Sequence, residues 1–142
     1  MIDPRRADRL HAVVLFLTGG FLVAYWVVYF TSGAVHAGED AVYIGFENAF
    51  PLADGFMAVC LFACGVQLWR QRATALFWGI AAGSTLIYLG CMDVLFNLEH
   101  GKYAEGGGPM VVETGINLYC LSFGPYTMLR LWQVRARLLA GA

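Results

Sequence analysis

Four long apolar blocks divide this sequence and restrict the chain to a helical membrane protein. The blocks cover residues 12–31, 46–69, 74–97 and 110–132, to within a few residues at each end. Each holds roughly 20 to 24 residues, the length at which an α-helix crosses the hydrocarbon of a bilayer. Of the 142 residues, 59% are hydrophobic and only 13% are charged, which excludes a disordered segment and is unusual for a water-soluble domain. We therefore predict a single membrane domain, residues 1–142, formed by an all-α bundle of four transmembrane helices.

The basic residues indicate how these helices are oriented. Eight of the nine Lys and Arg residues flank the blocks on one side of the membrane: Arg5, Arg6, Arg9, Arg70, Arg72, Arg130, Arg135 and Arg137. Lys102 alone falls on the other side. Because cytoplasmic loops carry the excess of Lys and Arg, we expect both termini to be cytoplasmic. The small size and the use of Arg over Lys suggest a bacterial inner (plasma) membrane protein.

The first block has an alternative interpretation as a cleaved signal peptide covering residues 1–37. An arginine-bearing start and the small-residue pattern Val35-His36-Ala37 fit such a segment. The apolar stretch is longer than the usual hydrophobic region of a signal peptide, so we expect the block to remain as a membrane span.

The cysteines predict neither a disulfide framework nor a metal site. Cys60, Cys64, Cys91 and Cys120 all lie inside predicted spans, whereas disulfides that staple small secreted domains lie in loops. Cys60 and Cys64 share a helical face, but no nearby His or third Cys completes a ligand set. We interpret all four as small apolar packing residues.

Acidic and small residues recur on one face of three predicted helices. At 100° per residue, each of three sets falls within roughly 60 to 80° of arc. Polar groups in membrane helices point away from lipid, and small residues allow helices to approach closely. We therefore predict a bundle closed by small residues in its cytoplasmic half and opened by a polar pocket in its outer half. The three sets are Glu47, Pro51, Asp54, Ala58 and Gly65; Gly79, Gly83, Gly90, Asp93 and Asn97; and Glu113, Asn117, Cys120, Gly124 and Thr127. The candidate ligand-binding residues are Glu47, Asn48, Asp54, Asp93, Asn97, Glu113 and Asn117.

The acids of this pocket have no basic neighbour within the membrane. Asp54 and Asp93 lie deepest, and a charge at the centre of a span costs at least about 2.5 kcal/mol on insertion scales. The carboxyls must therefore be protonated, share protons as pairs, or hold a cation from outside. Lys102, His36 or His100 could also fold over the pocket as a lid. The sequence does not choose among these arrangements.

Three functions fit this pattern. The first, which we favour, is binding of a cation or a cationic small molecule, with transport requiring a homo-oligomer or a partner. The second is an intramembrane acid–base enzyme, of isomerase or hydrolase type, that acts on a lipid-like substrate. The third is an accessory subunit of a larger membrane complex. The sequence names no cofactor, and no nucleic-acid partner is expected because the arginines follow membrane topology.

Two short motifs resemble the sterol-isomerase and sigma-2-receptor superfamily of compact helical bundles. They are Phe46-Glu47-Asn48 through Pro51 in the second block and Gly124-Pro125-Tyr126 in the fourth. The resemblance covers under a quarter of the chain, leaves the other acidic positions of that family unmatched, and assigns no catalytic role to any residue.

Overall fold

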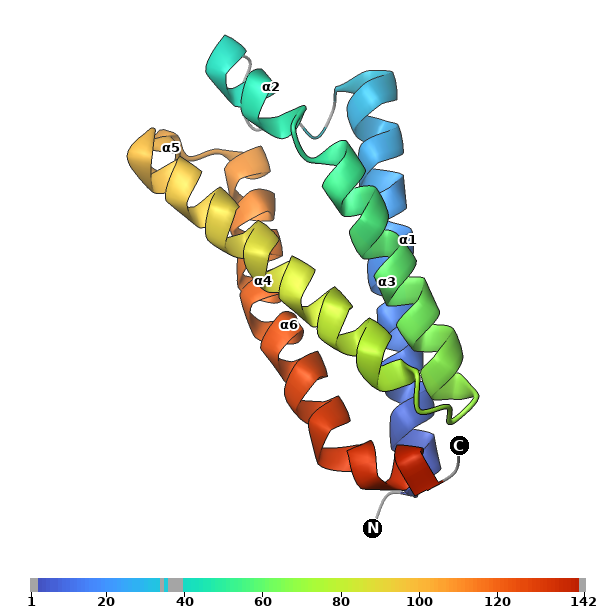
Figure 1. Cartoon of the computed structure of the whole chain (residues 1–142). Helices are drawn as coiled ribbons and strands as arrows, with labels where there is room; N and C mark the ends of the chain where they lie inside the picture. The colour runs from blue at the N-terminus through green and yellow to red at the C-terminus, as the bar shows by residue number, and fades with distance from the viewer. Residues whose placement is uncertain (1–2, 34, 36–39, 141–142) are drawn as a thin grey trace.

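The computed structural model describes residues 3–33, 35 and 40–140, and the regular elements in these ranges are helices. They are α1 (Pro4–Ser32), α2 (Ala41–Glu47), α3 (Pro51–Trp69), α4 (Ala75–Glu99), α5 (Lys102–Glu105) and α6 (Gly108–Ala140). Helix α1 lies beside α3, α4 lies beside α6, and α3 packs on α4 (Figure 1). The start of α1, the α3–α4 turn and the end of α6 gather at one end, which we call the terminal end; α2 and α5 lie at the opposite end.

Three helical stretches in the described residues are long and apolar enough to cross a membrane. They are Pro4–Ser32, Ala41–Trp69 and Ala75–Glu99, which indicates a multi-pass membrane protein. Large apolar side chains point outward from these stretches, as in Leu17 at 67% and Phe77 at 66% exposure, and such a surface suits contact with lipid. Helix α6 has 33 residues but is not among the three.

The second predicted span is interrupted in the structure, which corrects the continuous helix expected over residues 46–69. Helix α2 ends at Glu47 and α3 begins at Pro51. Pro51 has no amide hydrogen to donate to the carbonyl oxygen of Glu47. That oxygen accepts instead from the amide of Phe50, at 3.0 Å, in the turn between the helices.

Glycines set the contact between α4 and α6. A Cβ on Gly83 would lie 2.8 Å from the carbonyl oxygen of Gly124, and a Cβ on Gly124 would lie 2.8 Å from that of Gly83. A Cβ on Gly79 would overlap a methyl carbon of Leu131. These positions confirm the predicted closure by small residues on the matching faces of the two helices.

A buried ion cluster joins the helices at the terminal end. Asp8 of α1 is 1% exposed. Its carboxylate accepts from Arg130 at 3.0 Å, from Arg137 at 2.6 Å, and from the side-chain amide of Gln71 at 3.0 Å. The sequence pattern attributed both arginines to membrane topology alone, whereas here they also neutralise a buried acid. The cluster ties α1 to α6 and to the α3–α4 turn.

Replacing Gly83 by alanine tests the α4–α6 contact. We expect Gly83→Ala to lower the free energy of unfolding by about 1 to 3 kcal/mol, because the added methyl group meets backbone that cannot rotate away. Gly115→Ala, on the open side of α6 where a Cβ meets nothing within 4 Å, should leave stability unchanged or slightly higher. Denaturant unfolding in detergent micelles measures both, and equal stability of the two variants would contradict the contact.

Candidate functional site

Four carboxyl groups from four helices line one small cavity. Glu47 comes from α2, Asp54 from α3, Asp93 from α4 and Glu113 from α6. The cavity has a volume of about 40 Å³, enough for about three or four water-sized groups at roughly 10 to 15 Å³ each. The structure thus brings together the four acids that helical periodicity placed on matching faces. The remaining lining residues are Phe21, Leu22, Tyr25, Trp26, Phe50, Leu89 and Ile116.

Aromatic side chains of α1 reach two of these acids. The indole nitrogen of Trp26 donates to Oδ2 of Asp54 at 2.8 Å. The hydroxyl of Tyr25 donates to Oε2 of Glu47 at 3.5 Å. Both aromatic residues also line the cavity, so α1 supplies two neutral hydrogen-bond donors and part of the cavity wall.

Helix α2 and the end of α4 hold the outer two acids. The side-chain amide of Asn97 donates to Oε1 of Glu113. Tyr43, which is 1% exposed, interacts through its side chain with both Glu47 and Glu113. The candidate ligand-binding residues taken from the sequence did not include Tyr43. Tyr43 is buried where α2 meets the end of α4, and its ring centroid lies 6.3 Å from that of Phe96.

Asp93 differs from the other three acids. It is 9% exposed, and within the described part of the chain its carboxyl group has no hydrogen bond or ion pair. Its electrostatic neighbours are the other three acids, Glu47, Glu113 and Asp54. An unpartnered carboxyl in such a place is costly in either protonation state, because even a neutral polar group loses its hydrogen bonds with water.

The three predicted asparagines lie outside the cavity lining. Asn97 and Asn117 are 0% and 2% exposed, and the side-chain oxygen of each has no partner among the described residues. Asn117 donates to the hydroxyl of Tyr103 at 3.4 Å. Asn48 is exposed at the end of α2 and accepts from the hydroxyl of Tyr29 at 3.4 Å. Asn97 reaches the acids through Glu113, whereas Asn48 and Asn117 bind tyrosines.

The basic residues considered as a lid are engaged elsewhere. Lys102 is buried and donates to Asp40 at 2.8 Å and to Glu105 at 3.2 Å. Both hydrogen bonds raise the pKa of Lys102, and the bond to Asp40 has the larger effect. The same bond lowers the pKa of Asp40. His100 stacks on Phe96 with ring centroids 4.2 Å apart, and His36 lies outside the described residues. Across the described ranges, no Lys, Arg or His forms an ion pair with the four cavity acids.

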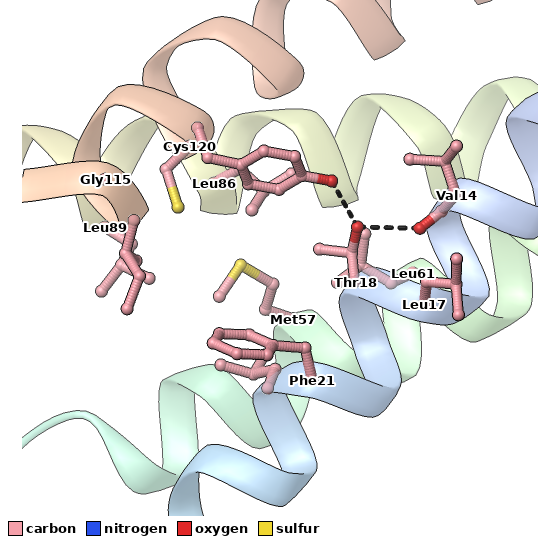
Figure 2. Close-up of a pocket in the computed structure, with 13 residues that line it drawn as sticks. Val14, Leu17, Thr18, Phe21, Met57, Leu61, Leu86, Leu89, Gly115 and Cys120 are labelled. Carbon is pink, nitrogen blue, oxygen red and sulfur yellow. Dashed lines mark hydrogen bonds between the residues drawn. The ribbon is translucent and has the colours of Figure 1, made fainter. Parts of the chain in front are cut away.

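A larger apolar pocket of about 450 Å³ adjoins the acidic cavity. Its wall comes from α1, α3, α4 and α6, and Met57 and Cys120 face the space between these helices (Figure 2). Thr18 donates to the carbonyl of Val14 at 2.8 Å, which leaves the hydroxyl of Tyr119 to donate to Thr18 at 2.5 Å. This chain of hydrogen bonds satisfies the polar hydroxyls of the wall. The two hollows share Phe21, Leu22, Leu89 and Ile116.

Comparison with protein-family models, curated proteins and solved structures finds no match to this chain. Its function is therefore argued from the geometry of its own site.

The ion pair of Asp40 with Lys102 predicts how stability depends on pH. The pKa of Asp40 is lower in the folded protein than in the unfolded chain, so its contribution is complete above the unfolded pKa and is lost as pH falls through the folded pKa. Thermal unfolding of wild type and Asp40→Asn across the acidic range should therefore show a higher Tm for wild type near neutral pH, with the difference shrinking on acidification. A difference that stays constant with pH would contradict the role of the Asp40 charge.

Proposed function

We propose that the protein is a four-span membrane protein, with both termini in the cytoplasm, that binds a small organic ammonium ion in its acidic cavity. The orientation follows from the eight arginines, which flank the helices on the side of the termini. A bacterial inner membrane fits this orientation. With both termini in the cytoplasm, α2, α5 and the nearby acids lie on the side of the membrane away from the cytoplasm.

Helix α6 serves in this proposal as the fourth span. Its 33 residues correspond to a length of about 50 Å at 1.5 Å per residue, more than the hydrocarbon thickness. Its polar groups Glu113 and Asn117 turn toward the bundle, where Glu113 lines the cavity and Asn117 is buried. The close contact between Gly83 and Gly124 keeps α6 against α4, which is long and apolar enough to span.

The single observation that carries cation binding is the buried, unpartnered Asp93. Four acids share about 40 Å³, and in the described chain no basic side chain neutralises them. An ammonium group offers donors to carboxyl oxygens and balances their charge, so it stabilises the arrangement that the protein alone leaves uncompensated. Asp93 is its proposed primary partner, with Asp54 and Glu47 as neighbours.

The size and walls of the cavity favour an ammonium group over a divalent metal. Among the described residues no three His, Cys, Asp or Glu side chains are arranged to hold a metal ion. Divalent cations such as calcium take six to eight oxygen ligands. The rings of Tyr25 and Trp26 line the cavity, and aromatic faces attract organic cations.

The adjoining apolar pocket would take the apolar part of the same ligand. The apolar pocket and the acidic cavity are neighbours, since both are lined by Phe21, Leu22, Leu89 and Ile116. The acidic cavity has room for little more than the charged group, whereas the apolar pocket has about 450 Å³. The proposed ligand is therefore an amine with a compact apolar body.

Removing the charge of Asp93 tests cation binding. Asp93→Asn keeps the shape of the side chain, and we expect it to weaken binding of methylammonium about tenfold or more, because a hydrogen bond to a charged group is worth about 1.5 to 3 kcal/mol. Calorimetric titration of the protein in nanodiscs measures the Kd. The control is Glu105→Gln, an acid at the same end of the bundle but outside the cavity lining. Absence of methylammonium binding to wild type, or equal binding to Asp93→Asn, would refute the proposal and favour an accessory subunit.

Filling the apolar pocket tests the second part of the ligand. Gly115 lines this pocket, and a Cβ there meets nothing within 4 Å. Gly115→Leu should weaken hexylammonium binding about tenfold, because it displaces apolar volume, and leave methylammonium binding unchanged. Gly20→Leu, at an open position of α1 outside the pocket lining, is the matched control. If Gly115→Leu binds hexylammonium as well as wild type, the apolar pocket is not part of the site.

A further inference from the structure

We infer that the terminal end of the bundle carries a second site, which binds the phosphate headgroup of an anionic phospholipid. A pocket of about 490 Å³ lies there, lined by Arg5, Arg70, Gln71, Arg72 and Arg137. The site draws on three separate parts of the chain: the start of α1, the α3–α4 turn and the end of α6. It needs only the placement of the helices in a membrane, and it stands apart from the acidic cavity and its ligand.

Three of the four arginines have no protein partner in the described residues. Arg5, Arg70 and Arg72 are exposed, and their guanidinium groups form no hydrogen bond or ion pair there. Arg9 and Arg135 are engaged: Arg9 lies over the ring of Trp69 at 5.7 Å, and Arg135 lies over that of Trp132 at 4.3 Å. Arg6 is exposed and lies outside the pocket lining. Within the described residues, three unpaired guanidinium groups therefore line the same pocket.

Gln71 holds the pocket in shape. It is the non-glycine residue with positive φ in the described backbone, at 54°, a conformation that L side chains rarely adopt. Its side-chain amide donates to Asp8 at 3.0 Å and to the carbonyl of Leu68 at 2.9 Å. Its side-chain oxygen accepts from Arg137 at 2.6 Å. One side chain therefore fixes both the turn that presents Arg70 and Arg72 and the guanidinium of Arg137.

The charge balance of this end leaves a positive surplus. The buried Asp8 is matched by Arg130 and Arg137, so it does not neutralise Arg5, Arg70 or Arg72. Asp3 is exposed and caps α1 by accepting from the backbone amide of Arg5. Guanidinium groups match the geometry of phosphate oxygens through paired hydrogen bonds, and basic pockets at the ends of membrane helices bind anionic headgroups.

The surroundings favour a lipid over free phosphate. Trp69 and Trp132 are 46% and 57% exposed at the same end of the bundle, and tryptophans of this kind lie at the level of lipid headgroups. A phosphate in the pocket would then sit at the depth of the headgroup layer, with apolar helix surface available to the acyl chains. Free phosphate would gain the charge contacts alone.

Short-chain phosphatidylglycerol, compared with phosphatidylcholine and inorganic phosphate, tests this site. The full-length protein in nonionic detergent is titrated with each probe, and binding is followed by native mass spectrometry and by the shift in Tm. The double variant Arg70→Gln with Arg72→Gln should weaken phosphatidylglycerol binding about tenfold to thirtyfold. Arg6→Gln with Arg135→Gln removes the same charge at the same end without altering the pocket lining, and it should keep nearly wild-type affinity.

The outcomes separate the alternatives. Selective phosphatidylglycerol binding that only the Arg70 and Arg72 variant loses supports the site. Equal losses in both double variants would show a diffuse charge effect and overturn it, as would binding of phosphatidylcholine as tight as that of phosphatidylglycerol. Stabilisation by inorganic phosphate alone, at equal affinity and with the same dependence on Arg70 and Arg72, would make the site a free-phosphate site and overturn the lipid assignment. Equal Tm values without any probe establish that the variants fold.

Discussion

Burial of a carboxyl group in an apolar bundle is the constraint on which this structure depends, and the chain meets it in two different ways. Asp8 is buried beside Arg130 and Arg137, so its charge is matched within the protein. Asp93 is buried beside three other acids and has no basic partner in the described residues. The first arrangement holds helices together, because removal of one partner would leave an isolated charge. The second leaves the acids around Asp93 without a basic partner, and an external ammonium ion would balance their charge.

The fold creates the arrangement around Asp93 by packing the α1–α3 pair against the α4–α6 pair at the terminal end. Gly83 and Gly124 bring α4 and α6 into backbone contact, and the cluster around Asp8 draws α1 to α6 at the terminal end. Toward the opposite end the pairs diverge (Figure 1), and the apolar pocket and the acidic cavity lie between their helices. The interruption before Pro51 lets α2 fold separately and supply Glu47 to the cavity.

Helical periodicity placed Glu47, Asp54, Asp93 and Glu113 on matching faces, because residues three, four and seven apart share a helical face. It did not predict the interruption between α2 and α3. It was insufficient for contacts set by tertiary packing. The arginines that hold Asp8 are more than 120 positions away from it, and no local pattern distinguishes them from topology signals. Asn48, Asn97 and Asn117 lie outside the cavity lining, and Asn48 is exposed at the end of α2, so their part in a binding site stays a prediction. The binding of Lys102 to Asp40 and Glu105 likewise follows from the placement of α2 and α5.

An experimental structure of the protein saturated with methylammonium in a lipid nanodisc tests the central claim most directly. The account predicts density for the ion between α3, α4 and α6, with its nitrogen at hydrogen-bonding distance from a carboxyl oxygen of Asp93. An empty cavity, with Asp93 turned toward lipid or bonded to a basic side chain of the protein, would contradict it.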